Sequence, residues 1–233
     1  MTTTTIDTAR AIIAEARAKG AKSLSEYDSK QVLAAHGVPV TAEHLADDAD
    51  GAARAAQEIG YPVVLKGNAP DLAHKTEAGL VEVGLADEAA LRDAAAHLLP
   101  KLPAGGGLLV QEMASGKREF LLGMTRDAQY GPCVTFGLGG IFAEALKDTV
   151  LRLTPVSETE ALSMMDEIRA AALLGPYRGM PEADRDALAR AIAGVSAAAV
   201  AHPEIAEIDV NPVIVADGGR PVAVDALVVL TSD

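Results

Sequence analysis

Three consecutive glycines, Gly105–Gly107, divide this sequence shortly after Pro103. A run of glycines gives a flexible joint rather than a helix or a strand. Helix and strand signals alternate on both sides of the joint, which predicts an α/β (α+β) fold of two lobes. Ligands often bind in the cleft between two such lobes. We expect an N-terminal helical extension at 1–24, a first lobe at 25–106 and a second lobe at 107–233.

Hydrophobic periodicity and stop signals predict the elements of each lobe. Ser25, with Asp28 three residues later, has the pattern of a helix N-cap. In the first part of the chain we expect helices at 7–19, 25–37, 47–59 and 87–99, and strands at 38–40, 62–66 and 80–85. In the second part we expect strands at 108–112, 119–125, 132–137, 205–215 and 221–229, and helices at 157–173 and 181–201.

Composition and charge narrow the class of protein. The 233 residues carry a formal net charge of −13, and a nucleic-acid partner would need clustered Lys and Arg that this chain does not supply. No apolar run reaches the roughly 20 residues that span a bilayer, and residues 2–7 lack the pattern of a signal peptide. The only cysteine, Cys133, has no partner for an intramolecular disulfide. We therefore expect a cytoplasmic protein that binds neither nucleic acid nor a membrane.

Lys66 stands at the end of the apolar strand that begins at Val63. A lysine with a buried stem and its ammonium at the strand end suits contact with a phosphate, and in an acidic protein local lysines would have to attract a polyanion. The alternative is a surface lysine at a strand end. The next residues, Gly67–Pro70, offer backbone amides for an anion, or form a simple turn.

His74 is the predicted catalytic residue. A neutral imidazole nitrogen can attack a phosphoryl group, and the adjacent Lys75 disfavours the protonated imidazolium. The alternative is an exposed loop histidine. The remaining histidines lack such neighbours and metal-ligand spacing, so we assign them to solvent or packing and expect no zinc site. They are His36, His44, His97 and His202.

Oxygen ligands gather near the C-terminus. Asp209 and Asn211 are two residues apart on a predicted strand and therefore share a face, and Asp225 lies on the following apolar strand. Two carboxylates and an amide suit Mg²⁺, with phosphate oxygens and waters completing the octahedron. The alternative is that these residues mark turns and a strand end.

The segment Gly137–Gly140 is a weaker signal. A G-x-G-G sequence between a strand and a predicted helical stretch has the context of a phosphate-binding turn. It equally fits a tight turn without a ligand.

Together these motifs resemble the ATP-grasp β subunits of ADP-forming acyl-CoA synthetases, over nearly the whole chain from about Ser25 to Thr231. Several motifs in the same order make the resemblance specific. The matching stretches are V-V-L-K at 63–66, H-K-T-E at 74–77, Q-E-M at 111–113, G-P-C-V-T-F-G-L-G-G-I at 131–141, D-T-V-L-R-L-T-P at 148–155, Y-R-G at 177–179, E-I-D-V-N-P at 207–212 and V-D-A-L at 224–227.

This resemblance implies an ATP-grasp fold, with two α/β lobes enclosing a nucleotide cleft, and a role for each matching residue. His74 would relay the phosphate between the nucleotide and a histidine of a partner subunit. Asp209, Asn211 and Asp225 would hold Mg²⁺. The residues implied to contact ATP or ADP are Lys66, Lys75, Gln111, Glu112, Met113, Glu119, Gly139 and Gly140.

The implied reaction is acid + CoA + ATP giving acyl-CoA + ADP + phosphate. No G-x-G-x-x-G fingerprint of a dinucleotide-type domain follows an N-terminal strand, so we expect CoA and the carboxylic acid to bind elsewhere. The resemblance implies that they bind through a separate CoA-binding α subunit, in an α2β2 assembly. We expect exposed apolar side chains near Leu72, Leu174 and Tyr177 to face that partner.

Two other functions fit the same residues. A partner-independent ATP-grasp carboxylate ligase would share the nucleotide residues without needing His74. A non-catalytic ATP-sensing module would bind ATP without turnover.

Overall fold

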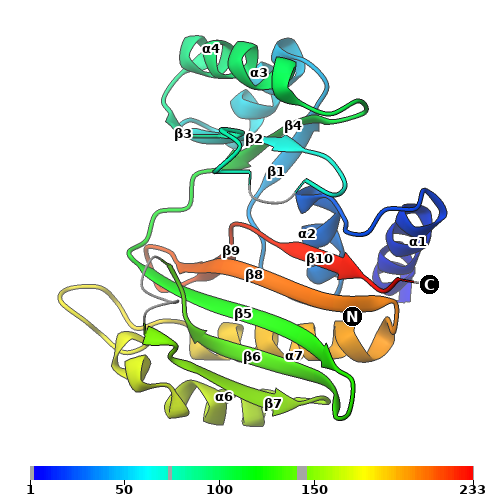
Figure 1. Ribbon diagram of the computed structural model, residues 1–233. Coiled ribbons are helices and arrows are strands. Elements are labelled where there is room, and N and C mark those ends of the chain that lie inside the picture. Colours follow the sequence, from blue (N-terminus) through cyan, green and yellow to red (C-terminus); the bar gives the residue numbers. More distant parts are fainter. Residues whose placement is uncertain (1–2, 73–74, 141–145, 233) are drawn as a thin grey trace.

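The computed structural model describes residues 3–72, 75–140 and 146–232, and it has two lobes, one above the other in Figure 1. The smaller lobe holds a four-stranded antiparallel sheet of order β1-β4-β2-β3. Its strands are β1 (Glu43–Ala46), β2 (Val63–Asn68), β3 (Val81–Leu85) and β4 (Gly107–Glu112). Its helices are α3 (Ala49–Ile59), α4 (Glu88–Leu98) and the short η1 (Leu99–Lys101).

Small side chains let α3 lie close to the smaller sheet. The buried face of α3 consists of alanines, whereas α4 contributes larger side chains such as Leu91 and Leu98. These pack against β2 and β4, where Leu65 and Val110 are fully buried. Asp48 and Asp87 cap the two helices by accepting hydrogen bonds from Gly51 N (2.7 Å) and Ala90 N (2.9 Å), which satisfies otherwise free amides.

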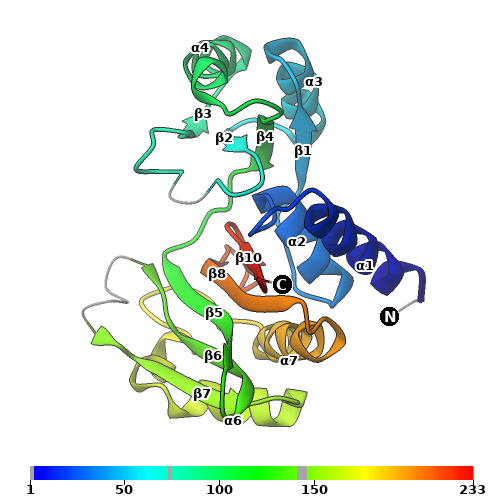
Figure 2. The same ribbon diagram turned by 45° about the vertical axis from the view of Figure 1, so that its right-hand side comes forward.

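The larger lobe holds a six-stranded sheet of order β10-β8-β5-β6-β7, with β9 paired to β8. Figure 2 shows α6 and α7 against one face of it. Its strands are β5 (Arg118–Asp127), β6 (Gly131–Leu138), β7 (Thr149–Leu153), β8 (Ile205–Val215), β9 (Pro221–Ala223) and β10 (Leu227–Leu230). Its helices are α6 (Glu158–Glu167), η3 (Arg169–Leu173) and α7 (Arg185–Ala201).

The two N-terminal helices pack on the larger lobe. They are α1 (Thr3–Ala18) and α2 (Glu26–Ala35), and α2 contacts α7 and β10. Val32 and Leu33 of α2 belong to the same core as the stacked rings of Phe120 and Phe136, whose centroids are 5.6 Å apart. The predicted N-cap of α2 is confirmed, because Ser25 Oγ accepts a hydrogen bond from Asp28 N at 3.1 Å.

The boundary between the two lobes differs from the predicted boundary. Strand β4 pairs with β2, Val64 opposite Gln111, so residues 107–112 belong to the smaller sheet and the chain crosses to the larger lobe between Glu112 and Arg118. Residues 3–35 lie with the larger lobe because α2 buries its apolar face there. No strand forms at 38–40, where Val40 makes one isolated bridge to Ala223.

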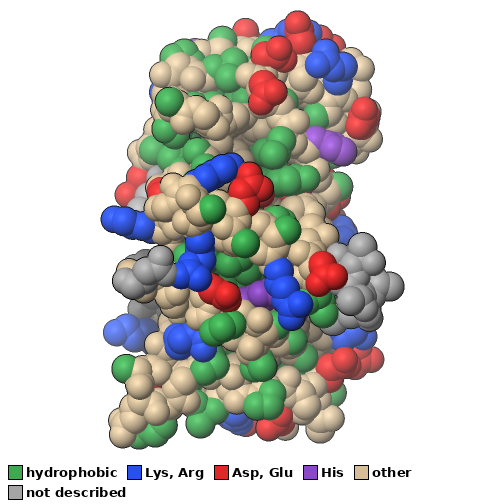
Figure 3. Space-filling view, turned by 90° about the vertical axis from the view of Figure 1, so that its right-hand side faces the viewer, with side chains coloured by type: hydrophobic (Ala, Val, Ile, Leu, Met, Phe, Trp, Pro, Cys, Tyr) green, Lys and Arg blue, Asp and Glu red, His purple; other side chains and the backbone are tan. Residues whose placement is uncertain are grey.

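Charges of both signs are mixed on the molecular surface. On the face shown in Figure 3, Lys and Arg side chains lie among Asp, Glu and apolar side chains rather than in one basic patch. Among the described residues, no helix is both long and apolar enough to cross a membrane.

Candidate functional site

A cavity of about 340 Å³ lies where the two lobes meet, and we call it the apolar pocket. Strands β2, β3 and β4 line it from the smaller lobe, and β8 with the segment after β9 lines it from the larger lobe. Val83 is 66% exposed and Met113 is 46% exposed, so both present apolar surface to the cavity. The lining residues are Val64, Lys66, Thr76, Val81, Val83, Gln111, Met113, Ala114, Pro212, Ile214, Val224 and Asp225.

A second cavity of about 280 Å³ adjoins the first, because Thr76 and Asp225 line both. We call it the polar pocket. It contains a cation, several carboxylates and an amide, where the apolar pocket has mainly hydrocarbon walls. Its lining residues are Leu72, Lys75, Thr76, Glu77, Asp209, Asn211, Asp225, Ala226 and Leu227. An apolar compartment next to a charged one suits a ligand with a flat apolar end and an anionic end.

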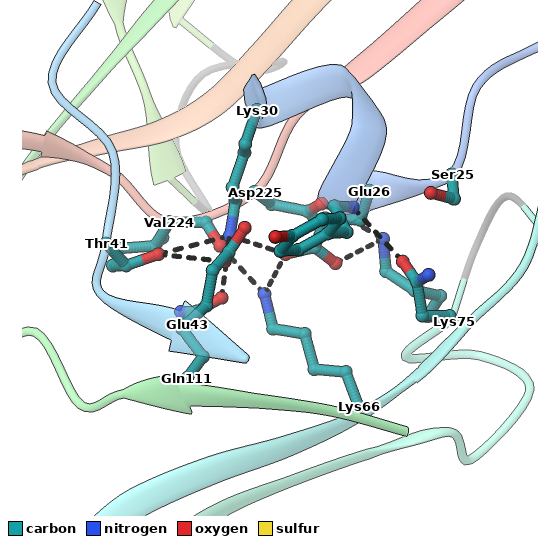
Figure 4. A network of polar contacts seen from close by, with 12 residues as sticks. Ser25, Glu26, Lys30, Thr41, Glu43, Lys66, Lys75, Gln111, Val224 and Asp225 are labelled. Atoms are coloured by element: carbon teal, nitrogen blue, oxygen red, sulfur yellow. Dashed lines mark hydrogen bonds and ion pairs between the residues drawn. The ribbon is translucent and has the colours of Figure 1, made fainter. Parts of the chain in front are cut away.

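Between these pockets and α2 lies a group of buried charges, the Glu26 cluster, drawn in Figure 4. At its centre the carboxylate of Glu26 has no solvent exposure. Its Oε1 lies 2.6 Å from Lys66 Nζ and 2.8 Å from Lys30 Nζ, and its Oε2 lies 2.7 Å from Lys75 Nζ. One carboxylate therefore pairs with three ammonium groups.

Each of the three lysines makes further hydrogen bonds or ion pairs. Lys30 Nζ also lies 2.7 Å from Glu43 Oε2 and donates to Gln111 Oε1 at 2.7 Å. Lys66 donates to the carbonyl oxygen of Val224 at 2.7 Å. Lys75 pairs with Asp225 Oδ1 at 3.0 Å. The cluster thus joins α2, the smaller sheet and the segment after β9, which come from both lobes (Figure 4).

Burial and charge compete in setting the pKa values of this cluster. Burial opposes ionisation of Glu26, but Lys66, Lys30 and Lys75 together hold the pKa of its carboxyl well below the ordinary value. Burial also disfavours a charged Lys75, yet Glu26 and Asp225 raise the pKa of its ammonium above the ordinary value. For Lys66 burial outweighs the attraction of Glu26, and the pKa is lowered.

The predicted magnesium ligands line the polar pocket together. Asp209 and Asn211 are both exposed on β8 while Val210 between them is buried, which confirms that they share a face. The surrounding protein partly removes water from the Asp209 carboxyl and thereby raises its pKa, as do the negative charges of Glu207 and Asp225. Burial raises the pKa of Asp225 as well.

A divalent cation would relieve this crowding of negative charge. Among the described residues, no three His, Cys, Asp or Glu side chains form a metal-binding group, so the third protein ligand here would be the Asn211 amide. Such an all-oxygen set fits Mg²⁺, which takes few protein ligands and keeps waters or phosphate oxygens.

The three predicted residues at the end of β4 differ in their surroundings. Gln111 is 2% exposed, and its side-chain oxygen accepts from Lys30 while the residue lines the apolar pocket. Met113 is exposed to the same pocket. Glu112 does not line it; its carboxylate accepts a hydrogen bond from Ala42 N at 3.1 Å and lies 3.6 Å from Arg220.

Glu119, Gly139 and Gly140 lie together at the start of β5 and the end of β6. Gly139 N donates to Glu119 O at 2.9 Å, and a Cβ at Gly139 would collide with the backbone of Phe120. Gly140 has a φ of +71°, and a Cβ there would collide with the Glu119 carboxylate. The glycines therefore permit a close backbone approach. Their predicted contact with phosphate stays a prediction.

Three further predictions concern His74, the segment after Lys66, and Leu174. His74 lies outside the described residues. The amide of Gly67 donates to Leu80 O at 2.9 Å, so this amide is not free to bind an anion, and Asn68 Oδ1 accepts from Tyr27 N at 3.1 Å. Leu174 is fully buried in the larger core, so it is not part of an exposed apolar surface.

Sequence reasoning missed Glu26 and Lys30. Both side chains are fully buried, although they stand at i and i+4 near the start of a helix. The only local signal was this Glu-x-x-x-Lys spacing, which more often marks an exposed helical ion pair.

Comparison with known proteins agrees with this architecture. A family model for the ATP-grasp domain matches residues 15–230. Subunit beta of the ADP-forming acetate–CoA ligase I of Pyrococcus furiosus is 38% identical over 229 residues, which cover 95% of this chain and 97% of that protein. The acetyl-coenzyme A synthetase 1 of Ca. Korarchaeum cryptofilum, solved with coenzyme A and Ca-AMPCP, matches with a TM-score of 0.89 and 38% identity, over 96% of this chain and 100% of that chain.

A longer relative shows the same similarity over part of its length. The ADP-forming acetate–CoA ligase I of Archaeoglobus fulgidus is 39% identical over 196 residues, which cover 82% of this chain but 29% of that protein. The fold, the two-lobed cleft and the domain match define an ATP-grasp protein. Within that class, the chain belongs to the family of the beta subunits of ADP-forming acetate–CoA ligases.

Proposed function

We propose that this chain is the nucleotide-binding subunit of an ADP-forming acyl-CoA synthetase, which makes acyl-CoA, ADP and phosphate from a carboxylic acid, CoA and ATP. The observation that carries the proposal is the pair of adjoining pockets at the lobe junction, one apolar and one lined by a lysine and oxygen ligands. The adenine ring would lie against Val83 and Met113 in the apolar pocket. The phosphates would extend into the polar pocket.

In this proposal the two lysines bind the phosphates. Lys66 lines the apolar pocket and Lys75 the polar one, so their ammonium groups can neutralise successive phosphates in a protein of net charge −13. Asp209, Asn211 and Asp225 would hold Mg²⁺, which when bound would neutralise further phosphate charge. The raised pKa values of the two carboxyls reflect the loss of water and the neighbouring negative charges in the polar pocket, which such a cation would offset.

His74 would carry the transferred phosphate. A ring nitrogen of neutral His74 attacks the γ-phosphorus, the bond from that phosphorus to the β,γ-bridging oxygen breaks, and ADP leaves. The adjacent Lys75 has a raised pKa and remains positively charged at neutral pH, which disfavours a second cation on the imidazole. The phosphoryl group would then pass from His74 to a histidine of the partner.

The partner would be a CoA-binding α subunit in an α2β2 assembly. Two findings support a partner: the Pyrococcus relatives are named as beta subunits, and the segment of the Archaeoglobus ligase that is similar to this chain makes up 29% of that protein. The carboxylic acid and CoA would bind through this partner. The acidic composition and the single cysteine agree with a cytoplasmic location.

Calorimetry of nucleotide binding tests the proposal. The chain should bind Mg-ATP, and EDTA should weaken that binding. Asp225→Asn should weaken Mg-ATP binding by about tenfold or more, because a charged metal ligand is lost, whereas Asp217→Asn in the exposed turn before β9 should bind as the unmodified chain does. Equal affinity with Mg²⁺ and with EDTA would contradict a magnesium-dependent nucleotide site.

A further inference from the structure

Glu26 lies close to both pockets but lines neither of them. Its side chain is fully buried behind Lys66 and Lys75, on the side of α2. A buried carboxylate is costly unless it is paired, and this one has three ammonium groups within 2.8 Å. Glu26 therefore cannot contact a ligand in either pocket without leaving these partners.

The two oxygens of Glu26 serve different pockets. Oε1 holds Lys66, which lines the apolar pocket, and Oε2 holds Lys75, which lines the polar pocket. Lys66 comes from β2 and Lys75 from the segment between β2 and β3, both in the smaller lobe, whereas α2 packs on the larger lobe. A single rigid carboxylate thus fixes the spacing between two ammonium groups and ties them to the opposite lobe.

We propose that Glu26 is a positioning residue, which holds the ammonium groups of Lys66 and Lys75 in place to receive successive phosphates of the nucleotide. This inference rests on the nucleotide site proposed above and adds a residue that touches no substrate. Pre-organised charges bind and stabilise an anion better than flexible ones, because no ordering is needed when the ligand arrives.

Without the Glu26 carboxylate, the contacts that remain orient the lysines poorly. Among the described residues, Lys66 would keep only the Val224 carbonyl, and Lys75 would keep only Asp225, which is a proposed magnesium ligand. Lys75 would then compete with the cation for that carboxylate. The three neighbouring ammonium groups would also repel one another. Each of these effects weakens phosphate binding, whereas Val83 and Met113, which would receive the base, do not belong to the Glu26 cluster.

The test compares Glu26→Gln with a matched control, Glu43→Gln. Glu43 is the other buried carboxylate of the cluster, and it pairs with Lys30 but with neither pocket lysine. Affinity for Mg-ATP is measured by calorimetry, and affinity for adenosine by ligand-observed NMR, which follows weak binding. Glu26→Gln should bind Mg-ATP at least about tenfold more weakly, because the ion pairs with Lys66 and Lys75 are lost, and should bind adenosine within about twofold of the unmodified chain.

The control should bind both ligands within about twofold of the unmodified chain. Undiminished Mg-ATP affinity in Glu26→Gln would overturn the inference, and so would an equal loss of Mg-ATP and adenosine binding, because that pattern belongs to a general disturbance of the cleft. If Glu26→Gln does not fold, Glu26→Asp keeps the buried charge on a shorter side chain that cannot span both lysines. It should also lose Mg-ATP affinity selectively, and wild-type affinity in this folded variant would overturn the inference.

The same measurements separate this inference from the proposed function. Failure of the unmodified chain to bind Mg-ATP would contradict the nucleotide site itself. Binding by the unmodified chain, with equal binding by Glu26→Gln, would contradict only the role of Glu26.

Discussion

Replacing Lys30 by methionine measures how much the Glu26 cluster contributes to stability. Lys30 is fully buried, and its Nζ pairs with Glu26 at 2.8 Å and with Glu43 at 2.7 Å. Methionine has a similar length but no charge. In the variant Glu26 keeps Lys66 and Lys75, whereas the Glu43 carboxylate loses the cation that it pairs with, and its Oε1 is buried without a hydrogen-bond partner among the described residues.

Removing one partner of a buried ion pair costs about 3–5 kcal/mol, because the other charge stays buried and unpaired. That is a large share of the roughly 5–15 kcal/mol by which domains are stable. Burial already raises the pKa of the Glu43 carboxyl even with Lys30 present, so Glu43 should take up a proton in the variant and limit the loss. We therefore expect the free energy of unfolding to fall by about 3 kcal/mol, at the lower end of this range.

Urea unfolding followed by circular dichroism is the assay, and α1 supplies the control. Glu15 and Lys19 repeat the same i, i+4 spacing, but both side chains are 68% exposed. Lys19→Met should leave the unfolding midpoint unchanged, since exposed ion pairs contribute little. Adding Glu43→Gln to Lys30→Met should recover part of the stability, because the unpaired charge is removed as well. Equal midpoints for Lys30→Met and Lys19→Met would show that the buried ion pairs of Lys30 contribute no more to stability than an exposed pair.

Two further predictions concern other parts of the molecule. The buried rings of His36 and His202 have their Nε2 atoms 3.0 Å apart, and burial, with the neighbouring ring, lowers the pKa of His36 to about 4. Because the folded state favours the neutral ring, the free energy of unfolding should fall as the pH drops from about 6.5 to about 4, with a slope of up to about 1.4 kcal/mol per pH unit. His36→Gln should reduce this slope in denaturant titrations, whereas replacement of the exposed His97 by Gln should not. An unchanged slope in His36→Gln would show that His36 does not cause the pH dependence of stability. Val83→Asp should weaken adenosine and Mg-ATP binding alike by about tenfold, since it places a charge on the wall proposed for the base. Val200→Asp, on the exposed face of α7, is its control, and equal calorimetric affinities in the two variants would place the base elsewhere.

Residues that follow strand periodicity could be predicted from the sequence. Asp209 and Asn211 are two apart, and a strand places such residues on one face whatever its neighbours are. The structure confirms this, and it brings Asp225 to the same pocket. The position of Lys66 near the end of β2 was also predicted from the sequence. Its ammonium group, however, is buried in an ion pair instead of lying free at the strand end.

Glu26 and Lys30 could not be predicted, because their role depends on distant parts of the chain. Locally they resemble Glu15 and Lys19, which have the same spacing and are exposed. The difference arises only where the smaller sheet docks on α2 and brings Lys66 to the carboxylate, 40 residues away in sequence.

The boundary between the lobes was misplaced for a similar reason. A glycine run predicts local flexibility, and Gly105 does have a positive φ of 80°. It does not reveal which sheet the following strand joins. Pairing of β4 between β1 and β2 is decided by long-range hydrogen bonds and by the burial of Leu108 and Val110 in the smaller core.

ADP release in the presence of ATP, Mg²⁺, CoA and a carboxylic acid tests the proposed function as a whole. It compares the chain alone, the chain co-expressed with a CoA-binding partner, and the same pair carrying His74→Ala. We predict turnover only for the unmodified pair, and a loss of roughly a thousandfold or more in His74→Ala with Mg-ATP binding retained, because a nucleophile acts in the chemical step. Acyl-CoA synthesis by the chain alone would favour a partner-independent ligase, and activity of the His74→Ala pair within about tenfold of the unmodified pair would remove His74 from the mechanism. Nucleotide binding without turnover in any of the three samples would instead identify an ATP-sensing module. Each of these three results would contradict the proposed function.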